Sequence, residues 1–156
     1  MSTARAIIYG TLVVGVLDAL DAIVFFGLRS GATPSGIFRT IAAGLVGRAA
    51  SQGGRGPVVL GVCLHFFIAF VIVTTYHVAS RRARILTDRP VIFGLLYGVA
   101  AYFVMSRIVV PLSALGGGGW PPLPVLVNGI LIHALGVGLP SALFARAASR
   151  TAGSGS

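Results

Sequence analysis

Four long hydrophobic runs, separated by short polar or glycine-rich segments, dominate the pattern along this chain. Crossing a bilayer takes about 20 helical residues, and each of the four runs is long enough to do so. The pattern therefore predicts an all-α, polytopic membrane protein folded as a four-helix transmembrane bundle. The predicted spans cover residues 6–28, 58–79, 91–115 and 125–145.

The segment between the first two spans is the only long connection. Within it, residues 34–54 hold a helix-like piece of about 16 residues, which is too short to cross a bilayer. We expect a short interfacial or re-entrant helix here, and a helix lying over the bundle as a lid is an equally open interpretation. Residues 1–150 then form a single transmembrane domain, and the small polar residues of 151–156 predict a disordered tail.

The composition is that of a membrane protein and limits the classes of partner. Only 10% of the residues are charged and the mean hydropathy is +0.95, whereas soluble domains carry about 25% charged residues. All twelve basic residues are arginines, and they lie between the runs rather than along one face. This distribution argues against nucleic-acid binding and favours anionic lipid headgroups as partners of Arg81, Arg82 and Arg84. The single cysteine, Cys63, excludes a disulfide framework.

The arginines also predict the orientation. Seven of them lie on the side of the bundle that holds both termini, and four lie on the other side. Because cytoplasmic loops carry the excess of basic residues, we expect both termini in the cytoplasm. The outer connection GGGGWPPLP cannot be helical, and Trp120 within it fits an interfacial anchor.

Ionisable residues interrupt the hydrophobic runs at similar depths. The first run contains two of the three carboxylates of the chain, those of Asp18 and Asp21. Consecutive spans run in opposite directions, so the depth of a residue is counted from whichever end of its span lies at the outer surface. Counted in this way, these two aspartates, His65 and His133 all lie roughly 10–15 Å below the outer surface. We therefore predict an intramembrane polar cluster made of Asp18, Asp21, His65, Asn128, His133 and Arg107.

Arg107 fits this cluster least well. It lies on the side of its helix opposite the small-residue face that carries Gly94 and Gly98. The alternative is that its long side chain extends to the outer headgroups.

The cluster is a candidate functional site because charged groups are costly inside a bilayer. Our first interpretation is a hydrogen-bonded clasp that holds together the helices of a structural or accessory membrane protein. The alternative is a proton- or ion-coupled transporter or channel component that acts as an oligomer. A divalent metal held by His65, His133 and Asp18 is a weaker candidate, because no short-spaced ligand motif supports it. Bis-histidine haem ligation is weaker still.

The sequence contains no nucleophile motif around its serines, so we expect no enzymatic activity. It contains no cofactor motif either, and none is expected to bind.

Small residues mark the faces on which the spans are expected to pack. Lipid provides no hydrophobic driving force between helices, so close backbone approach at small residues supplies the packing. Dimerisation through one such stripe is an open alternative. The predicted packing positions are Gly15, Gly94, Gly98, Gly129 and Gly136.

Three segments carry a resemblance to known proteins: LHFFIAFVIVTTYHVASRR (64–82), GLLYGVAAYFVMSRIVVPLSA (94–114) and NGILIHALGVGLPSALFAR (128–146). The chain resembles small bacterial inner-membrane proteins of unknown function and is similar, more distantly, to the YagU-like family. The shared pattern is a histidine early in the second span, a VxPLS end to the third and a histidine inside the fourth. The resemblance implies a multi-pass protein of the bacterial inner membrane and brings no catalytic residues.

Overall fold

The computed structural model describes residues 1–117 and 119–153, and over this part of the chain every regular element is a helix. Four helical segments are long and apolar enough to cross a membrane, which confirms the predicted all-α, four-span architecture. The first span is α1 (Thr3–Ser30) and the second is α3 (Gly56–Arg82). The third span consists of α5 (Pro90–Val104), η2 (Met105–Val109) and α6 (Val110–Leu112). The fourth consists of α7 (Leu123–Ile132), η3 (His133–Gly138) and α8 (Leu139–Gly153).

The span boundaries lie one to eight residues from the predicted ones. The third span ends at Leu112 because the backbone becomes extended at Ser113. The fourth continues as helix to Gly153, so the helix includes the first residues of the predicted tail. Residues 154–156 of that tail lie outside the described residues.

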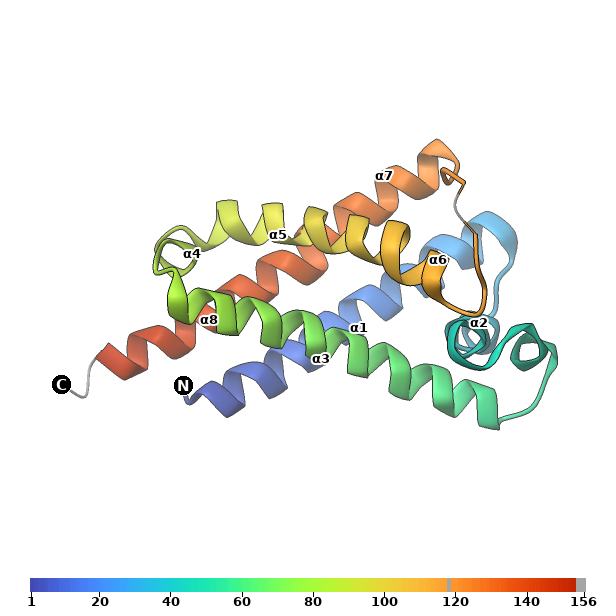
Figure 1. Ribbon diagram of the computed structural model, residues 1–156, viewed down its shortest axis with the longest axis horizontal. Coiled ribbons are helices and arrows are strands. Elements are labelled where there is room, and N and C mark those ends of the chain that lie inside the picture. Colours follow the sequence, from blue (N-terminus) through green and yellow to red (C-terminus); the bar gives the residue numbers. More distant parts are fainter. Residues whose placement is uncertain (118, 154–156) are drawn as a thin grey trace.

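Three shorter elements connect the spans: α2 (Pro34–Val46), η1 (Arg48–Gln52) and α4 (Ile85–Asp88). α2 begins at Pro34 because the Thr33 hydroxyl caps it, accepting a 3.1 Å hydrogen bond from the Gly36 N–H. Figure 1 shows that α2 lies across one end of the bundle, where each of the four spans ends or begins. We call this the α2 end, and the opposite end, where α1 begins and α4 lies, the α4 end.

The fourth span packs against each of the other three. Its closest approach is to α5, where Gly94 and Gly98 face Gly138 and the His133–Ala134 backbone. A methyl group on Gly98 would overlap the His133 carbonyl, so the two backbones touch only because no side chain intervenes. Glycine is required here for space rather than for backbone freedom.

The α4 half of the bundle is closed by side chains. Val14, Ala69, Val73 and Val137 form a buried cluster in which α1, α3 and the fourth span meet. Near it, the Tyr97 hydroxyl donates a 2.7 Å hydrogen bond across helices to the Ile72 carbonyl. The two halves therefore differ, since the α2 half encloses a cavity.

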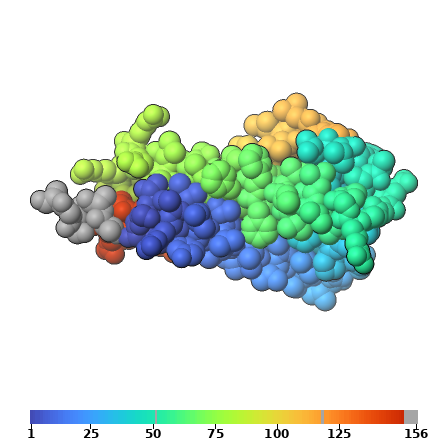
Figure 2. All heavy atoms as spheres, turned by 90° about the horizontal axis from the view of Figure 1, so that it is seen from below, coloured from blue at the N-terminus to red at the C-terminus, as the bar shows by residue number. Residues whose placement is uncertain are grey.

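Large apolar side chains cover the outside of the bundle. Leu28, Phe67, Leu96 and Val24 are each more than half exposed, with Leu28 at 86%. In Figure 2, α1 and α3 lie side by side along one face of the elongated molecule. An apolar surface on every span is what a bilayer requires.

Candidate functional site

Asp18 of α1 lies between two histidines that come from other spans. Its Oδ2 atom is 4.0 Å from Nδ1 of His65 on α3, and its Oδ1 atom is 3.9 Å from Nδ1 of His133 at the start of η3. Each carboxylate oxygen thus faces a different imidazole, at ion-pair distance. We call these three residues the His–Asp–His triad.

A backbone carbonyl fixes the orientation of each imidazole. His65 Nε2 is 2.8 Å from the Gly15 carbonyl oxygen on α1, and His133 Nδ1 is 3.0 Å from the Gly129 carbonyl oxygen one turn earlier. A carbonyl oxygen can only accept, so each of these ring nitrogens carries a hydrogen. Aromatic rings hold the imidazoles edge-on, Phe66 against His65 and Tyr102 against His133.

The remaining nitrogen of His65 determines the chemistry of the triad. Because Nε2 donates to Gly15, Nδ1 is the atom that faces Asp18. An unprotonated Nδ1 and an ionised carboxylate would place two electron pairs opposite each other. A proton added to either group converts this repulsion into attraction.

The second carboxylate of α1 has a partner on the fourth span. Asn128 Nδ2 donates a 2.7 Å hydrogen bond to Asp21 Oδ2. Asp21 lies about one helical turn nearer to the α2 end than Asp18 does. The polar groups therefore form two levels, with the triad deeper and the Asp21–Asn128 pair above it.

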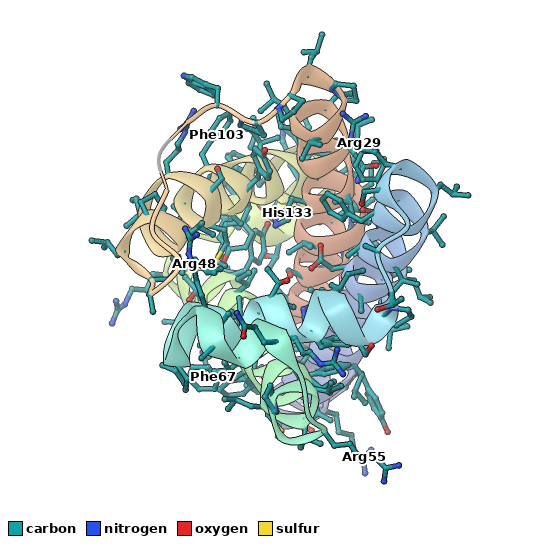
Figure 3. All side chains as sticks on the ribbon, turned by 90° about the vertical axis from the view of Figure 1, so that its right-hand side faces the viewer. Arg29, Arg48, Arg55, Phe67, Phe103 and His133 are labelled. Atoms are coloured by element: carbon teal, nitrogen blue, oxygen red, sulfur yellow. The ribbon has the colours of Figure 1, made fainter. Side chains whose placement is uncertain are left out.

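A cavity of about 770 Å³ separates the spans at these levels. All four spans contribute to its walls, and α2 lines it at the α2 end with Ile37, Thr40, Ile41 and Gly44. Most lining residues are apolar. Figure 3, viewed from the α2 end, shows His133 inside the ring of helices and Arg55 projecting outward. The polar side chains that line the cavity are Asp18, Asp21, Thr40, His65, Tyr102, Ser106, Ser113, Asn128 and His133.

The structure does not bring Arg107 into this group. Its guanidinium lies 3.5 Å above the ring of Trp120, and its Nη1 donates to the Gly119 carbonyl at 3.4 Å. Arg107 therefore extends to the connection at the α2 end, as the alternative interpretation of this side chain proposes, and it does not line the cavity.

The predicted packing glycines lie at helix contacts of different kinds. A methyl group on Gly15 would meet the Phe66 ring on α3, and one on Gly129 would overlap the Tyr102 ring on α5. Gly94 and Gly98 contact the fourth span directly. Gly136 is buried. A methyl group added to it would lie nearest to the side chain of Ile132, which belongs to the same span. Gly15 and Gly129 also supply the carbonyls that hold the two triad histidines.

Sequence reasoning missed two features that shape the cavity. The third and fourth spans each contain a π-helical turn, η2 and η3, and η3 begins at His133. Such wide turns are frequent at functional sites. A proline lies just beyond each turn, Pro111 after η2 and Pro140 after η3. Proline has no N–H group to donate to the carbonyl four residues earlier, so these prolines are the signal in the sequence for the wide turns.

The residues do not form a metal centre. Within the described part of the chain, no group of three or more His, Cys, Asp or Glu side chains could hold a metal ion. Nδ1 of His133 is already directed at the Gly129 carbonyl.

Comparisons of this chain with protein-family models, curated proteins and solved structures find no match. The resemblance to the YagU-like family therefore stays a prediction, and the functional argument rests on the cavity and the triad.

Proposed function

We propose that this protein is a proton-coupled transporter or carrier component whose substrate site is the cavity beneath α2. The observation that carries the proposal is the position of the His–Asp–His triad. It lines a partly open cavity of about 770 Å³ instead of being sealed between packed helices. A large, mostly apolar pocket with a few convergent polar groups is the usual form of a small-molecule site.

The triad supplies the coupling. A proton on His65 or Asp18 cancels charge at the floor of the cavity and thereby changes what the cavity binds. The titratable groups around Asp18 are Asp21 on its own helix, His65 on α3, His133 on the fourth span and Tyr102 on α5.

The placement in the cell belongs to the same proposal. We place the protein in a bacterial inner membrane with both termini and α4 in the cytoplasm, because that end carries the larger number of arginines. Arg81, Arg82 and Arg84 then meet anionic headgroups, and all three are exposed. Four helices make a thin conduit, so the active form is proposed to be a homo-oligomer.

Nitrogen-15 NMR of the histidine rings in detergent tests the proton coupling. The chain has three histidines, and His77, near the α4 end, serves as the internal reference. We expect the ring signals of His65 and His133 to change together with pH, because both rings face Asp18. Asp18→Asn should alter both responses, whereas Asp88→Asn, which alters the exposed carboxylate on α4, should leave them unchanged. Ring signals that change independently of each other, or not at all, would contradict the proposal.

A second candidate function is the clasp of a structural or accessory protein. It is favoured by two hydrogen bonds that cross between helices, His65 to Gly15 and Asn128 to Asp21. Asp18→Asn with Asp21→Asn separates the two candidates. A clasp loses thermal stability in detergent, whereas a transporter keeps its stability and loses proton flux in proteoliposomes.

A further inference from the structure

The cavity has an uneven distribution of charge. Two of the chain's three acidic side chains, Asp18 and Asp21, line it. None of the twelve arginines is among its lining residues in the described part of the chain, although arginine is the only basic residue type apart from histidine. With neutral imidazoles, the formal charge facing the space is therefore that of two carboxylates.

The rest of the wall is mostly apolar and comes from all four spans and α2. Within the described residues, no group of three or more His, Cys, Asp or Glu side chains could hold a metal ion, so a strongly hydrated inorganic cation has no such ligand set here. An organic cation differs because its apolar body replaces water along the wall while its charge lies near the carboxylates. Apolar contacts on four sides are supplied by Ile37, Ile41, Ile68, Val109 and Ile132.

We infer that the cavity binds a lipophilic organic cation, held by Asp18 and Asp21 within the apolar wall. This inference rests on the proposed function and names the substrate class of the same site. Its volume of about 770 Å³ falls in the range of about 300–1,000 Å³ that accommodates drug-sized ligands.

The geometry also explains how protons and the cation exclude each other. Asp18 is 4.0 Å from His65 and 3.9 Å from His133, so a proton on either imidazole neutralises the carboxylate that the cation needs. Asp21 is held by the neutral amide of Asn128, which leaves its negative charge in place. Cation binding at the triad therefore releases protons, and acidification releases the cation.

Two ions of nearly identical shape and opposite charge provide the test: tetraphenylphosphonium and tetraphenylborate. Their binding to the purified full chain in a neutral detergent is measured by equilibrium dialysis, with protein-free micelles subtracted. We expect saturable binding of tetraphenylphosphonium that weakens as the pH falls, and no saturable binding of tetraphenylborate. Asp18→Asn with Asp21→Asn should weaken binding about tenfold or more, whereas Asp88→Asn should leave it unchanged.

A second variant keeps the test decisive if the double substitution impairs folding. Ile41→Trp adds a bulky ring to the wall that α2 supplies and leaves both carboxylates intact, and it should also weaken saturable binding. Binding of the cation that survives both substitutions, or equal binding of the anion, overturns the inference. The histidine titration above does not depend on either probe, so failure of the cation assignment is distinguishable from failure of proton coupling.

Discussion

Asn128 Nδ2 donates a 2.7 Å hydrogen bond to Asp21 Oδ2, joining two residues that lie 107 positions apart in the chain. The bond connects α7 to α1 on the wall of the cavity, where few other contacts join these two helices. It also supplies a hydrogen-bond donor to a carboxylate that would otherwise face an apolar space. The pair therefore bears on both the stability of the bundle and the charge of the cavity.

Replacement of Asn128 by Ala should lower the free energy of unfolding by about 1 kcal/mol, the usual scale for a hydrogen bond between membrane helices. A double-mutant cycle with Asp21→Asn, measured by thermal unfolding in detergent, isolates the coupling between the two side chains. We expect a coupling energy of similar size. Strictly additive single effects would show that the hydrogen bond does not contribute to stability.

Gly98→Ala should destabilise the fold more than any cavity substitution. The added methyl group would overlap the His133 carbonyl and the Ala134 backbone, which cannot rotate away as a side chain can. Overpacking of this kind typically costs about 1–3 kcal/mol, and the shift would also displace the triad histidine. Gly56→Ala, at the first residue of α3 where a methyl group meets nothing within 4 Å, is the matched control. Equal thermal stability of the two variants would contradict the close packing of α5 on η3.

Much of this architecture could be predicted from the sequence because the bilayer imposes it. Length and apolarity define the spans, and the fixed helical rise gives the common depth of Asp18, His65 and His133. The role of α2 could not be predicted, since its position depends on a tertiary contact in which the Phe38 carbonyl lies against Gly61 of α3. The direction of Arg107 was equally undetermined, because a side chain that long reaches either the bundle or the surface.

Arg107→Ala should release Trp120 at the α2 end. The guanidinium lies 3.5 Å above the indole ring, and a contact of this kind at an exposed site contributes about 0.5–1 kcal/mol. Trp120 is the only tryptophan in the chain, so intrinsic fluorescence reports on it alone. We expect lower fluorescence anisotropy and stronger quenching by acrylamide. Arg150→Ala, at the opposite end of the fourth span, should change neither quantity, and an unchanged signal in Arg107→Ala would count against the stacking.

The docking of α2 over the cavity predicts a specific cross-link. A Cβ atom built on Gly44 lies 3.7 Å from Cβ of Ser113, close to the mean of about 3.8 Å found in disulfides. The two segments are already joined there, since the Ala114 N–H donates a 2.8 Å hydrogen bond to the Gly44 carbonyl. Gly44→Cys with Ser113→Cys, in a background where the exposed Cys63 is replaced by Ser, should therefore form a disulfide upon mild oxidation.

Closing this loop should stabilise the oxidised protein by about 2–4 kcal/mol against unfolding, because it restricts the unfolded chain. Mass spectrometry measures the yield of the disulfide, and thermal unfolding with and without reductant measures its effect. The control pair is Gly36→Cys with Ser113→Cys, since a Cβ on Gly36 meets only Thr33. If both pairs cross-link equally, α2 moves freely over the bundle end. If neither does, α2 lies elsewhere, and the cavity loses the part of its wall that α2 supplies.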